Sequence, residues 1–394
     1  MRNLNVRKAA SVAASLALAL SIAACGNSAN EAPADVAEAT AEEAATEETA
    51  DYTYDRIGEW DVENPMFGGT MRAVMATMGT EGMDFDAFVN SELGEFSVAS
   101  FDLAAIGDIT SEDVAAYWAE LGMVHEAHDA DDAEKQWTSI VPDDYDASKA
   151  YPLLFCWHGN DNPILMAEGY GVGQAAAERD WIVVFPWASN DDIHLDEFDR
   201  ILAYMTENYN IDATRIYTTG FSKGGSTSAN LARSKSDVLA AAAPCGISAA
   251  VNSTLEGALA YGLEGTDPSD YEPIPIQIFG GELDVFGAMP YNDEFKVDGI
   301  NNYLSKFGIE GHEQTLEASL ALIESSENEV EKAIGLTFDE TETVALDGTT
   351  YHIGRYLDAD GNVCLQVVEC DGAIHWPTPS MGELVCSFLE NYSK

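Results

Sequence analysis

The sequence predicts an α/β fold in which helices cover both faces of a mostly parallel β-sheet. From residue 131 to the C-terminus, short runs of apolar and β-branched residues alternate with longer amphipathic segments. This alternation is typical of repeated β-α-β units. In addition, 46% of the 394 residues are hydrophobic, so the chain has enough apolar side chains for a large core.

The elements of this sheet follow one another along the second half of the chain. The predicted buried strands are residues 153–157, 181–185, 215–219, 238–243, 274–279 and 363–369. The predicted helices are residues 164–179, 195–209 and 226–233, of which 195–209 shows apolar residues three and four positions apart. Because helices separate the strands, consecutive strands are predicted to run parallel.

The first 25 residues read as an export signal, outside the fold. Arg2, Arg7 and Lys8 precede an apolar run at 9–24, shorter than the ~20 residues that a membrane-spanning helix needs. The run ends in Ile-Ala-Ala-Cys, which resembles the lipobox of bacterial lipoproteins. We therefore expect Cys25 to carry the lipid that anchors the protein outside the cytoplasm, on the bacterial cell membrane. The alternative is an ordinary signal peptide with an incidental cysteine.

Two further segments precede the predicted α/β domain at 131–394. Residues 26–55 are rich in Ala, Glu and Thr and are expected to form a disordered acidic tether. Residues 56–130 form an N-terminal extension for which the sequence suggests no role. Within it, Thr110-Ser111-Glu112-Asp113 is expected to be a capping box that opens a helix ending at Leu121.

The charge of the chain restricts its partners. Acidic residues outnumber basic ones 69 to 18, which gives a formal net charge of -51. A surface this negative repels phosphate backbones and anionic lipids, so nucleic-acid binding is excluded and membrane contact is expected only through the N-terminal lipid.

The six cysteines predict neither a zinc site nor an assignable disulfide. Five remain after Cys25, and no C-x-x-C pair occurs among them. Each is expected to be either a buried small apolar residue or part of a disulfide that spacing alone does not identify. They are Cys156, Cys245, Cys364, Cys370 and Cys386.

The strongest chemical motif is Gly220-Phe221-Ser222-Lys223-Gly224. It follows the predicted strand 215–219 and precedes the predicted helix 226–233, which is the context that a nucleophile elbow requires. Glycines allow the sharp turn that lifts the serine hydroxyl out of the sheet. The motif therefore predicts that Ser222 is a catalytic nucleophile.

An acid and a base should follow this serine in chain order, each just past a strand. Asp284 follows the predicted strand 274–279 and is the expected acid, with Glu282 as the alternative. His375 lies past the last predicted strand and ahead of the closing helix, and it is the expected base. The acid should hold the imidazole in the tautomer that accepts the serine proton.

The oxyanion hole and the pocket are expected near the same strand ends. The main-chain N–H groups of Lys223 and Asn160 are the predicted oxyanion donors, with Asp161 as the alternative to Asn160. His158 is expected to brace that loop. Candidate substrate-binding side chains are Trp187, Trp376 and Phe221.

Taken together, the runs YPLLFCWHGN, RIYTTGFSKGG, GGELD and GAIHWP resemble the α/β-hydrolase superfamily. Within it, they are most similar to the secreted polyhydroxybutyrate depolymerase and feruloyl esterase type. The resemblance covers residues 135–394 and implies ester hydrolysis through an acyl-serine intermediate, without metal or organic cofactor. The chain departs from the family in residues 56–130 and in a polar, helix-like insertion at 309–340, before the catalytic histidine.

Other sites are less favoured. Residues 358–362 imitate the start of a calcium loop, but Val363 stands where that loop needs glycine, so a hairpin turn is expected. His125 and His128 lie in an acidic stretch expected to be exposed, and no geometry for a metal is evident there.

These observations predict a lipid-anchored serine esterase that cleaves polyester, feruloyl or acetyl esters. One alternative is a serine peptidase of the prolyl-oligopeptidase type, which shares the elbow and the residue order. Another alternative is a non-catalytic surface binding protein on a hydrolase scaffold.

Overall fold

The computed structural model describes residues 60–63, 68–159, 164–187, 194–247, 271–286 and 289–394. The predicted signal at 1–25, with Cys25, and the predicted tether at 26–55 lie outside these residues. Among the described residues, no helix has both the length and the apolar character needed to cross a bilayer.

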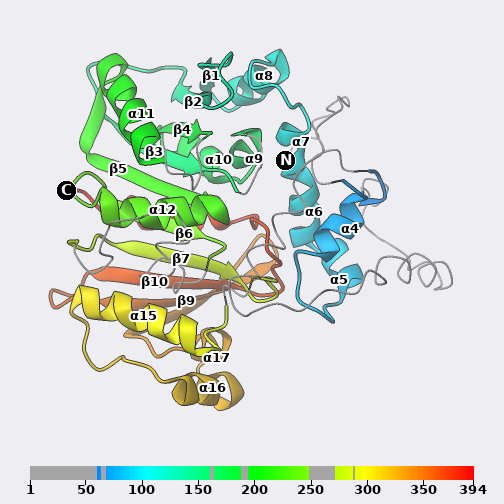
Figure 1. The fold of residues 1–394 in the computed structure, drawn as a ribbon, viewed down its shortest axis with the longest axis vertical. Coiled ribbons are helices and arrows are strands. Elements are labelled where there is room, and N and C mark those ends of the chain that lie inside the picture. Colours follow the sequence, from blue (N-terminus) through cyan, green and yellow to red (C-terminus); the bar gives the residue numbers. More distant parts are fainter. Residues whose placement is uncertain (1–59, 64–67, 160–163, 188–193, 248–270, 287–288) are drawn as a thin grey trace, which may run out of the picture.

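Within the described residues, a ten-stranded sheet forms the centre of the molecule, in the order β1-β2-β4-β3-β5-β6-β7-β10-β9-β8 (Figure 1). The strands are β1 (Met123–His128), β2 (Trp137–Pro142), β3 (Tyr151–Trp157), β4 (Ile182–Pro186), β5 (Ile211–Phe221), β6 (Ala241–Cys245), β7 (Ile276–Gly281), β8 (Glu340–Leu346), β9 (Thr349–Leu357) and β10 (Val363–Cys370). Six neighbouring strands of this sheet, β4-β3-β5-β6-β7-β10, run parallel. Strands β2 and β1 extend one edge in antiparallel pairs, and strands β9 and β8 extend the other in the same way.

Helices cover both faces of this sheet. They are α4 (Met71–Ala76), α5 (Phe85–Val89), α6 (Glu92–Ala99), α7 (Phe101–Ala104), α8 (Glu112–Glu120), α9 (Ile164–Glu168), α10 (Val172–Ala177), α11 (His194–Asn208), α12 (Lys223–Ser234), α15 (Glu294–Phe307), α16 (Leu316–Ser325), α17 (Glu329–Ile334) and α18 (Met381–Leu389). Figure 1 shows α12 and α15 across one face and α4 to α6 gathered at one end of the sheet.

Two apolar cores result from the alternation of side chains along the buried strands. In β3, Leu154 and Cys156 belong to one core, whereas Leu153 and Phe155 belong to the other. The first core includes residues of α8, α9, α10 and α18, and the second includes residues of α11, α12, α15 and α17. The predicted α/β architecture, with helices on both faces of a mostly parallel sheet, is confirmed.

Several local predictions need correction. The predicted helix 164–179 is two helices, because Gly171 adopts a φ of +84° and starts α10 afresh. Helix α8 is capped by Ser111, whose hydroxyl accepts the Asp113 N–H, while Thr110 bonds Asp108 instead. The strand predicted at 238–243 begins only at Ala241, as β6.

The edge of the sheet also differs from the expectation. Strand β1 starts at Met123, ahead of the domain boundary expected at residue 131, and it carries both histidines of the acidic stretch. The His125 side chain is only 3% exposed and bonds the buried Glu168 carboxylate at 3.0 Å. The expectation that this stretch is exposed is therefore wrong for His125. His128 stacks on the Trp137 ring, with 3.8 Å between ring centroids.

Two other sequence expectations concern turns and cysteines. Residues 358–362 form the turn between β9 and β10, closed by the Asp358 N–H bond to the Asn362 carbonyl at 2.8 Å. Cys156, Cys245, Cys364, Cys370 and Cys386 are all buried and unpaired thiols. Burial raises the pKa of the Cys245 thiol to about 12, so this group next to the elbow stays protonated at neutral pH.

Candidate active site

Ser222 sits on a strained turn between β5 and α12. Strand β5 ends at Phe221 and α12 begins at Lys223, so Ser222 alone makes the turn. Its φ of 59° and ψ of -119° are unusual for a residue with a side chain. Its main-chain N–H is held by the Cys245 carbonyl of β6 at 2.9 Å.

The glycines beside Ser222 allow close approach of neighbouring backbone. A Cβ on Gly224 would overlap the carbonyl oxygens of Trp157 and His158 at the end of β3. A Cβ on Gly220 would lie 2.6 Å from the Gly224 carbonyl oxygen. Because these contacts are to backbone, a side chain at either position would have to displace the elbow itself. The G-x-S-x-G pattern thus has a steric cause in this fold.

His375 connects the serine to an acid. Its Nε2 lies 2.8 Å from the Ser222 hydroxyl oxygen, and its Nδ1 lies 2.8 Å from Asp284 Oδ2. An ionised carboxylate only accepts hydrogen bonds, so Nδ1 carries the proton and Nε2 is left to accept from the hydroxyl. All three sequence-predicted triad residues therefore meet at one site.

Asp284 is held rigidly in the loop after β7. Its side chain is 1% exposed, and its second oxygen accepts the Phe286 N–H at 2.8 Å. The alternative acid, Glu282, is exposed and accepts the Gly372 N–H at 2.9 Å instead. The structure thus places Asp284, and not Glu282, against the imidazole.

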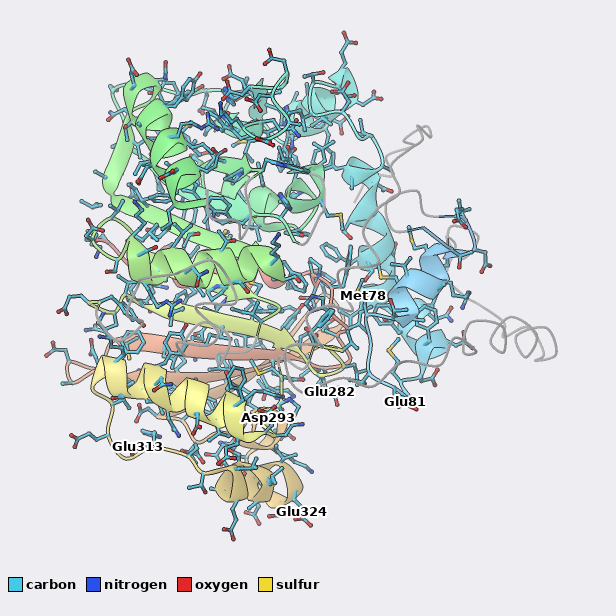
Figure 2. The ribbon with its side chains drawn as sticks, viewed as in Figure 1. Met78, Glu81, Glu282, Asp293, Glu313 and Glu324 are labelled. Carbon is cyan, nitrogen blue, oxygen red and sulfur yellow. The ribbon has the colours of Figure 1, made fainter. Side chains whose placement is uncertain are left out.

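The N-terminal extension supports both loops of the triad. The Met78 carbonyl accepts the N–H of His375 at 2.8 Å and that of Val285 at 3.2 Å. The Thr80 N–H donates to the Leu283 carbonyl at 2.9 Å. Figure 2 shows Met78 and Glu282 where the extension meets the end of the sheet. The sequence carried no signal for this contact, because main-chain bonds between distant segments leave no residue-type pattern.

Of the predicted oxyanion donors, the structure describes only Lys223. Lys223 is the first residue of α12, so its main-chain N–H belongs to the first helical turn, next to Ser222. Asn160 and Asp161 lie outside the described residues. His158 braces the strand end as expected, since its ring nitrogens lie 2.6 Å from the Gly159 carbonyl and 2.5 Å from the Trp187 carbonyl.

The three predicted pocket aromatics have different surroundings. Phe221 is buried with its ring centroid 5.1 Å from that of His375. Trp376 is buried and donates its Nε1–H to Ser100 at 2.8 Å, so it belongs to the contact with the extension and not to a pocket. Trp187 lines a hollow of about 200 Å³ that Ser222 does not line.

The sequence reasoning missed Phe286. The residue is 45% exposed, and its ring meets the His375 ring edge-on, with 4.5 Å between centroids. An exposed aromatic ring beside the His375 imidazole offers an apolar surface to a bound molecule. The sequence signal that could have found it was its position two residues after Asp284, because the loop after β7 brings the neighbours of Asp284 to the same site.

The order of these elements decides the fold type. Nucleophile, acid and histidine follow β5, β7 and β10, which are strands of the parallel part of the sheet. The chain has the α/β-hydrolase fold.

Comparison with known proteins finds partial matches to esterases. No family model matches the chain. It is 29% identical to feruloyl esterase D of Neurospora crassa over 127 residues, which are 28% of this chain and 44% of that protein. It is 27% identical to a probable feruloyl esterase C of Aspergillus niger over 195 residues, 43% of this chain and 68% of that protein. The chain thus spans less than half the length of the first of these relatives.

Among solved structures, the chain is similar to an acetyl xylan esterase from Aspergillus awamori. The TM-score is 0.45 at 12% identity, over 68% of this chain and 98% of that protein.

Proposed function

We propose that this protein is a serine carboxylic ester hydrolase that works through an acyl-serine intermediate. The observation that carries the proposal is the chain of two 2.8 Å hydrogen bonds from Asp284 through His375 to Ser222. The similarity to feruloyl esterases supports an ester as the substrate.

The geometry supplies each step of ester cleavage. His375 Nε2 takes the hydroxyl proton as Ser222 Oγ attacks the ester carbonyl carbon, and Asp284 stabilises the resulting imidazolium. The Lys223 N–H would donate to the oxyanion that develops on the carbonyl oxygen. His375 then protonates the departing alkoxide, and water repeats the same sequence on the acyl-serine to release the acid.

We further infer that the preferred substrates are esters of aromatic acids such as ferulic acid. The names of the relatives support this class, and so does the exposed Phe286 ring next to His375. Acetyl esters and polyesters such as polyhydroxybutyrate belong to the same reaction type and serve as comparison substrates.

The nucleophile is tested with a fluorophosphonate probe, which reacts covalently with activated serines. The wild-type protein should be labelled, and Ser222→Ala should not. Ser228→Ala is the matched control, because Ser228 lies in α12 but its buried hydroxyl has no hydrogen-bond partner among the described residues. Equal labelling of the wild type and Ser222→Ala would contradict the assignment.

A substrate panel tests the reaction class. Methyl ferulate, p-nitrophenyl acetate, p-nitrophenyl butyrate, polyhydroxybutyrate and a peptide anilide are compared by kcat/KM. Turnover of methyl ferulate above the other compounds is expected. Faster cleavage of the peptide anilide would favour a peptidase, and no turnover of any ester would favour a binding protein on a hydrolase scaffold.

We also propose that the protein is exported and anchored through a lipid on Cys25. The basic start, the apolar run and the Ile-Ala-Ala-Cys sequence support this localisation. In a detergent phase-partition experiment the full-length protein should enter the detergent phase, and Cys25→Ala should move to the aqueous phase. The same partition for both proteins would contradict lipidation.

A further inference from the structure

A second cluster of titratable side chains lies on β9 and at the end of β10. The ligating atoms of His352, Glu369 and Asp371 all lie within 4.8 Å of one another. His352 on β9 and Glu369 on β10 are directly opposite in the strand register, and Asp371 follows the end of β10. None of these residues takes part in the ester-cleaving steps.

Glu369 is the unusual member of this cluster. Its side chain is 1% exposed, and both carboxylate oxygens are buried with no hydrogen-bond partner among the described residues. The charged groups that act on it are the carboxylates of Asp371 and Glu282, which repel a negative charge. A buried carboxylate is normally paired with a cation or bound to a metal, and within the described part of the chain this one is paired with no cation.

His352 is oriented as metal-binding histidines commonly are. Its Nδ1 lies 3.2 Å from the Thr343 hydroxyl oxygen, and its Nε2 lies 3.1 Å from Asp371 Oδ1. Without a cation, Nε2–H donates to the Asp371 carboxylate and Nδ1 accepts from the Thr343 hydroxyl. A cation that displaces the Nε2 proton would leave Nδ1–H to donate to Thr343, which would fix the tautomer and direct the Nε2 lone pair toward the two carboxylates. The imidazole thus has a supporting partner on the side away from the cluster.

We propose that His352, Glu369 and Asp371 form a site for a divalent cation that accepts both nitrogen and oxygen ligands, of which Zn²⁺ is the probe. One imidazole and two carboxylates match the donors that Zn²⁺ takes in proteins, with water completing the shell. Ca²⁺ and Mg²⁺ prefer oxygen ligands alone, so they should bind more weakly. The cation would neutralise Glu369 and join β9 and β10 to the loop that leads to His375.

The test is a titration of the full-length protein after its metals have been removed with a chelator. Isothermal titration with Zn²⁺ at high ionic strength, which screens the acidic surface, should give one site per chain. The thermal midpoint should rise on addition of Zn²⁺, and Ca²⁺ should not reproduce the rise.

Variants locate the site. Glu369→Gln keeps the shape of the side chain but removes its charge, and it should abolish the one-site isotherm. Thr343→Val should weaken Zn²⁺ binding about 10–100-fold, because it removes only the partner of the imidazole. His312→Gln is the matched control, since His312 also pairs with a carboxylate, Asp339, at 3.0 Å, but lies outside the cluster. Its Zn²⁺ affinity should equal that of the wild type.

Three results would overturn the proposal. The first is the absence of a one-site isotherm in the wild-type protein. The second is unchanged Zn²⁺ affinity in Glu369→Gln, which would show that Glu369 is only a buried acid. The third is loss of binding in His312→Gln, which would place the cation elsewhere. These readouts are binding and thermal stability, so their outcome is independent of the proposed esterase activity.

Discussion

Replacing Asp284 by asparagine should disable the triad while leaving the fold intact. The Phe286 N–H at 2.8 Å needs an acceptor, so the amide oxygen of the introduced asparagine would take the position of Asp284 Oδ1. The amide nitrogen would then face His375 Nδ1, where the carboxylate oxygen now lies at 2.8 Å. This nitrogen is a donor, so it forces the imidazole to accept at Nδ1 and to carry its proton on Nε2.

The size of the effect follows from that tautomer. With a proton on Nε2, the imidazole donates toward the Ser222 hydroxyl and no longer accepts its proton. Loss of the correct tautomer costs about 10⁴-fold in kcat, equivalent to ~5 kcal/mol of transition-state stabilisation. The free energy of unfolding should change by less than ~1 kcal/mol, because the substitution preserves the number of hydrogen bonds at this position.

The assay is steady-state hydrolysis of p-nitrophenyl acetate, with urea unfolding measured in parallel. Glu282→Gln is the control, because its exposed side chain keeps an acceptor for the Gly372 N–H and does not reach the imidazole. Its kcat should remain within about threefold of the wild type, well below the tenfold change that about 1.36 kcal/mol produces. This account of the triad would be refuted if kcat fell by less than tenfold in Asp284→Asn. It would also be refuted if kcat fell by more than tenfold in Glu282→Gln.

Two further predictions concern the pocket and the stability of the domain. Phe286→Ala should raise KM for methyl ferulate about tenfold, which is the equivalent of one aromatic contact. The thermal midpoint should not fall, because the residue is 45% exposed. An unchanged KM would show that the ring does not touch the substrate. Arg179→Met should cost about 1 kcal/mol of unfolding free energy at pH 7, because Arg179 bonds both oxygens of Glu383, at 2.7 and 2.9 Å, and joins the segment after α10 to α18. Hydrogen bonds from Arg179 lower the pKa of Glu383, so this stabilisation is complete above the ordinary glutamate pKa and is lost as the pH falls through the lowered value. Urea unfolding at pH 7 and near pH 3 should therefore show a difference between the proteins that shrinks in acid, and a constant difference would argue against the ion pair.

Features encoded by neighbouring residues could be predicted well from the sequence. The strand, turn and helix around Ser222 depend on glycines and apolar residues within one short segment, and the structure places them as expected. The order of Ser222, Asp284 and His375 predicted that they meet, because the carboxyl ends of parallel strands lie at one edge of a sheet, and the structure brings them together. The break at Gly171 was missed, because apolar periodicity continues across a residue whose positive φ ends the helix.

The sequence by itself therefore predicted the α/β architecture and the three residues that converge on one site, since both depend on short-range patterns along the chain. Only the tertiary structure decided what residues 56–130 do for the site. Met78 supports His375 and Val285 through its carbonyl oxygen, a group that every residue possesses. The structure alone also brought His352, Glu369 and Asp371 together. Their proximity follows from the pairing register of β9 and β10, which is set by packing across the whole sheet and not by any local motif.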